Sequence, residues 1–201
     1  MSECGGLDPV LFEYVPDFLE PREADQALER LWRELEWSRR EITLFGRRVL
    51  QPRLVAWYGE PDAVYRYSGS TLEPLPWHPL LLRLKHRLEE RGGSCFNSVL
   101  ANAYRDGNDS MGWHSDDEKE LGLEPVIASL SLGAPRRFLL RPRNREAQPA
   151  ARKQLQLAHG SLLLMKGKSQ QRFQHALPRT RHPVGLRINL TYRLVGAQAP
   201  V

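Results

Sequence analysis

Long apolar runs are absent from this 201-residue sequence. The longest, such as Leu162–Met165, have the length of a β-strand, whereas a membrane-spanning helix needs about 18 or more consecutive apolar residues. Residues 1–6 contain neither a basic segment nor an apolar stretch, so no signal peptide is visible. The two cysteines, Cys4 and Cys95, are too few for a disulfide framework or, alone, for a four-ligand zinc site. These absences predict a soluble protein of a reducing intracellular compartment, cytoplasmic in a bacterium and nuclear in a eukaryote.

Lysine is scarce, and acidic residues are scarce in the last third of the chain. Of the 29 basic residues only five are lysine. Residues 136–201 carry 14 basic side chains and one acid, Glu146, a net charge of +13, whereas residues 1–135 have a net charge of −8. Because arginine binds phosphate and carboxylate groups bidentately, this asymmetry is typical of a protein with a polyanionic partner. From charge alone, an arginine-rich solvated face is an equally good interpretation.

The length, the hydrophobic content of 41% and the lack of repeats or linkers predict one domain with a sizeable core. Apolar residues recur at helical spacing in residues 21–37 and 79–91, and Pro21 suits a first helical turn. After Gly93 the spacing changes, and strands are expected at 94–104, 126–132, 137–141, 155–166 with a break at His159-Gly160, and 185–195. Two helices followed by many short strands predict an α+β fold built around a sandwich or barrel.

Strict alternation makes the last strand the clearest prediction. Its polar residues, all on one face, are Arg187, Asn189, Thr191 and Arg193. The Cα atoms of the two arginines would lie roughly 20 Å apart, so their long side chains could hold both ends of a small dicarboxylate. From this strand alone, a solvent-exposed face with two ordinary arginines is the simpler interpretation.

His114 and Asp116 are separated by one residue, so in an extended chain they point the same way and suit one metal ion. A second histidine would complete the two-His-one-carboxylate triad of non-haem Fe(II) oxygenases. His175 is the best candidate, because it stands shortly before the last strand. Asn102 and Tyr104 share a face upstream and can hydrogen-bond a bound carboxylate. Taken singly, each of these features also fits an ordinary structural role.

Taken in order, these residues resemble the Fe(II)/2-oxoglutarate dioxygenases of the AlkB family over about residues 37–195, and most closely its DNA-repair members that accept duplex DNA. The resemblance implies an α+β fold, a double-stranded β-helix (jelly roll) with N-terminal helices buttressing one sheet. Residues 1–20 are then expected to form an N-terminal extension. Residues 21–201 would form one dioxygenase domain with a nucleotide-recognition region at about 40–70.

The same resemblance assigns the chemistry. His114, Asp116 and His175 would bind Fe(II) as the catalytic centre. The residues expected to hold 2-oxoglutarate are Asn102, Tyr104, Arg187, Asn189 and Arg193. With O2, such enzymes hydroxylate an N-methyl group on a base such as 1-methyladenine or 3-methylcytosine. They release formaldehyde, succinate and CO2.

The resemblance also implies contacts to alkylated DNA, double- or single-stranded. A flipped base would stack between Tyr67, with Tyr65 beside it, and His114. Asp117 and Glu118 would lie near the polar edge of the base and favour a cationic lesion. Phe45 resembles a finger that fills the gap left in a duplex. Phosphate contacts are expected from basic residues, namely Arg141, Arg143, Arg145, Arg152, Lys153, Arg179 and Arg181.

The sequence therefore predicts a monomeric, iron- and 2-oxoglutarate-dependent DNA dealkylase. Three alternatives stay open. The same chemistry on RNA would use the same active-site residues. A catalytically silent nucleic-acid-binding module is disfavoured by the complete triad and both arginines. A small-molecule hydroxylase on the same fold would leave the positive charge of residues 136–201 without a purpose.

Overall fold

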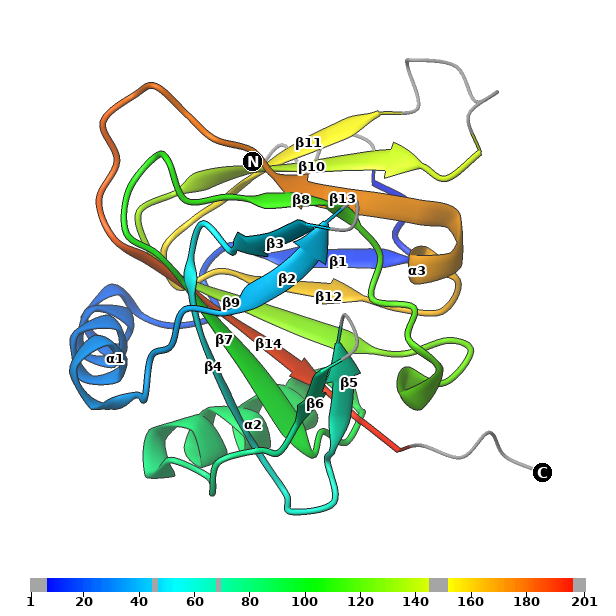
Figure 1. The fold of residues 1–201 in the computed structure, drawn as a ribbon, viewed down its shortest axis with the longest axis horizontal. Coiled ribbons are helices and arrows are strands. Elements are labelled where there is room, and N and C mark those ends of the chain that lie inside the picture. The colour runs from blue at the N-terminus through cyan, green and yellow to red at the C-terminus, as the bar shows by residue number, and fades with distance from the viewer. Residues whose placement is uncertain (1–6, 45–46, 68–69, 145–151, 197–201) are drawn as a thin grey trace.

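The computed structural model describes residues 7–44, 47–67, 70–144 and 152–196, and its centre is a pair of facing antiparallel sheets (Figure 1). The larger sheet has six strands in the order β1 (Phe12–Val15), β12 (Leu162–Met165), β9 (Ile127–Gly133), β14 (Arg187–Arg193), β7 (Ser98–Tyr104) and β4 (Leu54–Gly59). The smaller sheet has four strands in the order β11 (Lys153–Leu157), β10 (Arg136–Pro142), β13 (Phe173–Leu177) and β8 (Met111–His114). The expected α+β fold with a jelly roll is confirmed.

In the described part of the chain, four helical segments and two hairpins accompany the two sheets. The helical segments are α1 (Pro21–Glu34), α2 (Pro79–Gly92), the 3₁₀ turn η1 (Lys119–Leu121) and the short α3 (Ser169–Arg172). One hairpin pairs β2 (Glu41–Leu44) with β3 (Arg47–Leu50), and the other pairs β5 (Tyr65–Tyr67) with β6 (Ser70–Leu72). None of the helices in the described ranges has the length and apolarity needed to cross a lipid bilayer.

Both long helices pack on the outer face of the six-stranded sheet, because each has a continuous apolar face. Helix α1 buries Ala24, Ala27 and Leu31, and helix α2 buries four leucines. Together with alternate residues of β4, β7, β9, β12 and β14, they form the largest apolar cluster of the described residues. Figure 1 shows α1 and α2 together at one side of the molecule. The prediction of N-terminal helices that buttress one sheet is confirmed.

The inner face of the six-stranded sheet carries the other alternate residues. Near β1 and β12 these are apolar, and residues such as Phe12 and Leu163 form one cluster with Phe138 of the smaller sheet. Along β14 they are the four polar residues singled out by the sequence. Arg187 is only 1% and Arg193 only 4% exposed, so the interpretation of this face as a solvent-exposed one is wrong. Both arginines lie between the sheets.

The predicted helices and strands are found within a few residues of their expected bounds, but β1 differs from the expectation for residues 1–20. Phe12 pairs with Met165 and Val15 with Leu162, which makes β1 an edge strand of the larger sheet. Residues 12–15 are therefore part of the fold, not of an extension. A four-residue strand is too short to show a period in the sequence, and its long-range partner supplies most of its stabilisation.

Gly133, at the end of β9, has a φ of +83°, and a Cβ atom there would lie 2.2 Å from the Leu186 carbonyl oxygen. Gly133→Ala should lower the free energy of unfolding by roughly 1–3 kcal/mol, because a positive φ strains an alanine and the clashing atom is backbone. Gly185→Ala is the matched control, since a Cβ there meets nothing within 4 Å. Equilibrium denaturation in urea measures both. Equal losses in the two variants would contradict the strain.

Candidate metal and co-substrate site

The three predicted metal ligands meet at one edge of the smaller sheet. His114 ends β8, Asp116 follows two residues later, and His175 lies in β13 directly opposite His114. One ligand atom from each residue lies within 4.8 Å of the others. The imidazole rings of the two histidines have centroids 4.1 Å apart. The structure thus brings together two nitrogens and one carboxylate at a spacing that suits a single ion.

A β-bulge positions His114. Its partner on β13 is His175, whereas Met111 pairs with Leu177, so β8 uses one residue more than β13 over the same stretch. In a regular strand, Met111 and His114 would point to opposite faces because they are three residues apart. The extra residue turns both toward the interior, where they line the same cavity as His175.

Asp116 is held through both its carboxylate and its backbone. The Arg193 guanidinium donates a hydrogen bond of 2.7 Å to its Oδ1, and both side chains are buried. The backbone N–H of Asp116 donates to Oε1 of Gln170, a buried residue of α3, at 3.0 Å. The orientation of this metal-ligating group is therefore set before any ion binds.

Protonation states favour cation binding as well. Burial, together with the neighbouring His114, lowers the pKa of His175 to about 3, so His175 is neutral at pH 7 with a lone pair available. Burial alone would raise the pKa of Asp116, but Arg193, His175 and His114 outweigh it and lower the pKa to about 2. A neutral imidazole and an ionised carboxylate are the forms that bind a divalent metal.

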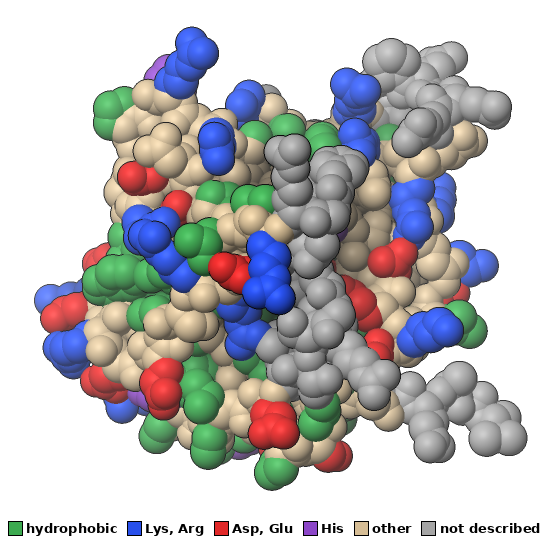
Figure 2. All heavy atoms as spheres, in the orientation of Figure 1, with side chains coloured by type: hydrophobic (Ala, Val, Ile, Leu, Met, Phe, Trp, Pro, Cys, Tyr) green, Lys and Arg blue, Asp and Glu red, His purple; other side chains and the backbone are tan. Residues whose placement is uncertain are grey.

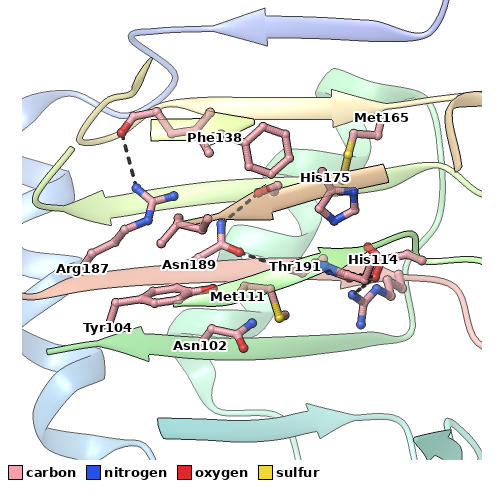
Figure 3. Close-up of a pocket in the computed structure, with 15 residues that line it drawn as sticks. Asn102, Tyr104, Met111, His114, Phe138, Met165, His175, Arg187, Asn189 and Thr191 are labelled. Atoms are coloured by element: carbon pink, nitrogen blue, oxygen red, sulfur yellow. Dashed lines mark hydrogen bonds and ion pairs between the residues drawn. The ribbon is translucent and has the colours of Figure 1, made fainter. Parts of the chain in front are cut away.

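A cavity extends from the triad along β14 between the sheets (Figure 3). Figure 3 shows His114 near one end and Arg187 near the other, with Asn189 and Thr191 between them. Apolar side chains, Phe138, Leu157, Met165 and Leu177, line it from the other strands, next to Met111. The cavity joins a metal-binding end to a basic end.

Arg187 is a buried cation whose described partners are neutral. Its guanidinium donates to Ser131 Oγ at 2.8 Å and to the Leu157 carbonyl at 3.4 Å, while its Nε has no hydrogen-bond partner in the described part of the chain. Burial lowers its pKa to about 10, so it stays protonated at neutral pH. A buried charge is costly unless a counter-charge is present. The site therefore fits a ligand that brings a carboxylate.

The other residues expected at the co-substrate also line this cavity. Asn102 and Tyr104 project from β7, and Asn189 and Thr191 from β14. Asn189 donates to Ser129 Oγ at 2.8 Å, and Thr191 donates to Asn189 Oδ1 at 3.0 Å. Arg193, however, lies beside Asp116. The two arginines of the last strand thus occupy different ends of the site.

A second cavity shares Met111, His114, Asp116 and Arg193 with the first. The rest of its lining comes from the residues that precede and follow the β2–β3 hairpin and from neighbouring strands and loops. These lining residues are Arg40, Gln51, Arg53, Val55, Leu100 and Glu118. Arg53 links the two cavities, because its Nε donates to Oδ1 of Asn102 at 2.8 Å. Two of the three candidate metal ligands, His114 and Asp116, therefore line both cavities.

Sequence reasoning missed several of these residues. Ser129 and Ser131 alternate with apolar residues in β9, a signal of the same kind as that in the last strand, and could have been found. Gln51 and Arg53 stand in a segment without periodicity, and only the packing of β4 against β7 brings Arg53 to Asn102.

Of the predicted substrate residues, Glu118 lines the second cavity. Asp117 instead forms an ion pair with Arg143, which also donates to the Gln170 carbonyl at 3.2 Å. These two residues, expected at the base edge and at phosphates, contact each other. Phe45, Arg145 and the side chains of Tyr65 and Tyr67 lie outside the described residues.

The remaining predicted phosphate contacts come from the smaller sheet and its loops. Arg152, Arg179 and Arg181 are exposed, and Lys153 begins β11 half-buried. Arg141 lies 4.2 Å from the ring of Trp113 and also donates to Gln174. On the face shown in Figure 2, basic side chains predominate in the upper half, where the smaller sheet lies, and acidic ones in the lower half.

Comparison with known sequences supports the family resemblance that the sequence motifs indicated. The family model described as the 2OG-Fe(II) oxygenase superfamily matches residues 12–193. The alpha-ketoglutarate-dependent dioxygenase alkB homolog 3 of Bos taurus is 46% identical over 186 residues, which cover 90% of this chain and 64% of that protein. The human counterpart is 45% identical with the same coverage. This chain thus spans a little under two thirds of these relatives.

The DNA oxidative demethylase ALKBH2 of Mus musculus is 39% identical over 180 residues, which cover 86% of this chain and 75% of that protein. Among solved structures, OsALKBH1 superimposes with a TM-score of 0.66 at 17% identity, over 94% of this chain and 99% of that one. A prolyl hydroxylase of Trichoplax adhaerens gives 0.60 at 14% identity, over 92% and 84%. Because their sequence identities are low, these two solved structures support the fold alone. With its triad, its basic cavity and these relatives, the chain belongs to the AlkB family of 2-oxoglutarate- and Fe(II)-dependent oxygenases.

Proposed function

We propose that this protein demethylates N-alkylated bases in DNA, as a monomer, using Fe(II), O2 and 2-oxoglutarate. The observation that carries the proposal is one cavity that joins a His-Asp-His triad, in which Asp116 and His175 are buried and His114 is half-buried, to a buried arginine with only neutral described partners. The relatives named as DNA oxidative demethylases support the substrate class. The excess of basic residues in 136–201 supports a polyanionic partner.

Within this proposal, His114, Asp116 and His175 hold the iron. Arg187 binds the distal carboxylate of 2-oxoglutarate, with Asn102, Tyr104 and Asn189 along the co-substrate and Arg193 at the metal end. The bound iron, with 2-oxoglutarate and O2, supplies the oxidant that hydroxylates the N-methyl group, which then leaves as formaldehyde. Phe138, Met165 and the other apolar side chains exclude water from this chamber.

The second cavity would admit the damaged base, because it reaches the same metal ligands from the side of the hairpins. We assign residues 40–70 to nucleotide recognition, with Tyr65 and Tyr67 on β5 as stacking partners. Aromatic stacking offsets part of the stacking that a flipped base loses. Glu118, in the wall of this cavity, would favour a positively charged lesion.

A direct assay tests the reaction. With Fe(II), ascorbate and 2-oxoglutarate, the protein should release formaldehyde from an oligonucleotide that carries one 3-methylcytosine, and omission of iron or 2-oxoglutarate should abolish the release. Asp116→Ala should abolish turnover and weaken binding of Mn(II), measured by calorimetry, at least about 100-fold, because a charged ligand is lost. Asp17→Ala, at an exposed acid, is the control. Appreciable succinate formation by Asp116→Ala would refute the metal assignment, and succinate without formaldehyde in the wild type would refute the substrate.

Arg187→Met should raise the KM for 2-oxoglutarate by about 100-fold or more, because it removes the cation that lines that end of the cavity. Arg137→Met, at an exposed residue of β10, is the matched control. Succinate formation as a function of 2-oxoglutarate concentration gives both constants. An unchanged KM in Arg187→Met would place the carboxylate elsewhere.

Phe45→Ala should reduce demethylation of a duplex about tenfold or more and spare the single strand, if Phe45 fills the gap left by a flipped base. The ratio of the two rates, measured on one sequence in both forms, gives the result. Equal losses of demethylation rate on the duplex and on the single strand would show that Phe45 has no specific role in duplex recognition.

A further inference from the structure

Two side chains in the wall of the second cavity carry buried polar atoms that lack a hydrogen-bond partner among the described residues. They are Oε1 of Gln51 and Nε of Arg40. Gln51 is only 4% exposed. Most buried polar atoms in native proteins are hydrogen-bonded, because burial without a partner costs free energy. A buried, unpaired amide in the wall of a cavity indicates that a ligand supplies the missing partner.

The backbone fixes Gln51 in this place. Its N–H donates to the Arg40 carbonyl at 2.8 Å, and the carbonyl of the next residue, Pro52, accepts from the N–H of Ser110 at 3.3 Å. Gln51 thus follows β3 on a segment held on one side by the chain before the hairpin and on the other by the chain before β8. These backbone hydrogen bonds hold the Cα atom of Gln51 at the wall of the cavity.

The other polar side chains in the wall of the second cavity differ from Gln51 in the hydrogen bonds that they can form. Arg40 and Arg53 only donate hydrogen bonds, and Arg53 is already bonded to Asn102. Glu118, when ionised, only accepts. The amide of Gln51 can do either, because rotation about its terminal bond exchanges the oxygen and the NH2 group.

We propose that Gln51 binds the exocyclic group beside the methylated ring nitrogen of the damaged base, an inference that rests on the proposed function. In cytosine and adenine this group is an amino donor, and in thymine and guanine it is a carbonyl acceptor. The amide oxygen would accept from the former, and the amide NH2 would donate to the latter. Gln51 is then a specificity-determining residue that lets one pocket take both amino and carbonyl lesions.

The test compares two lesions that differ mainly in this group, 3-methylcytosine and 3-methylthymine, in the same oligonucleotide. Gln51→Glu can only accept when ionised, so it should raise the ratio of kcat/KM for 3-methylcytosine over 3-methylthymine about tenfold or more, since a carboxylate repels a carbonyl oxygen. Gln51→Met keeps the length and removes both functions, so kcat/KM should fall about tenfold for both lesions. Gln154→Met, on the exposed side of β11, should leave the ratio and the rates unchanged.

The ratio is measured within one preparation, so a partly unfolded variant does not change it, and urea denaturation reports the folding of each variant. Binding of both oligonucleotides, followed by fluorescence anisotropy under nitrogen, should shift in the same direction as the kinetic ratio. An unchanged ratio in Gln51→Glu, with an active wild type, would overturn the assignment of Gln51 and leave the proposed function intact. A wild type that neither binds nor demethylates either lesion would overturn both.

Discussion

The two-residue period of β14 is the constraint on which the rest of the structure depends. Every second residue, Ile188, Leu190 and Tyr192, is buried under the helices. The alternate residues, Arg187, Asn189, Thr191 and Arg193, face the smaller sheet, and the first and last of these are buried arginines. Because β14 is hydrogen-bonded to β7 on one side and β9 on the other, a shift of one residue would exchange the two faces. Packing of the helices therefore also fixes where the charges lie.

Burial of the two guanidinium groups of β14, those of Arg187 and Arg193, costs free energy unless their charges are balanced. The two charges are balanced in different ways. Arg193 is neutralised by Asp116, at 2.7 Å. Arg187 has only the oxygens of Ser131 and Leu157 as acceptors in the described structure. One charge is thus balanced within the protein, and the other is left for a ligand. Under the proposed function, this difference between the two arginines would separate the metal end of the site from the co-substrate end.

Much of this arrangement could be predicted from sequence because it depends on local patterns. The alternation of β14, the spacing of His114 and Asp116, and the apolar faces of α1 and α2 all follow from residues close together in the chain. The bulge in β8 could not be predicted, since it exists only relative to β13. The same holds for β1 and for Gln51, whose places depend on partners far along the chain.

The two cavities share part of their lining, so ligand binding in one cavity can affect ligand binding in the other. Met111, His114, Asp116 and Arg193 contribute to both, and the Arg53–Asn102 hydrogen bond joins the outer chamber to the inner one. A ligand that orders one chamber therefore orders side chains of the other. Under the proposed function, the co-substrate and the base would be coupled in this way.

The position of β8 in the smaller sheet bears on how the site gains and loses its ion. In the described part of the chain, β8 is an edge strand, paired with β13 alone, whereas β13 lies between β10 and β8. Local opening of β8 breaks fewer hydrogen bonds than any displacement of β13. Of the two histidines, His175 therefore lies on the more firmly held strand, and local opening of β8 would move His114 together with the loop that follows it. Exchange of the ion can proceed from the β8 side while the hydrophobic core stays folded.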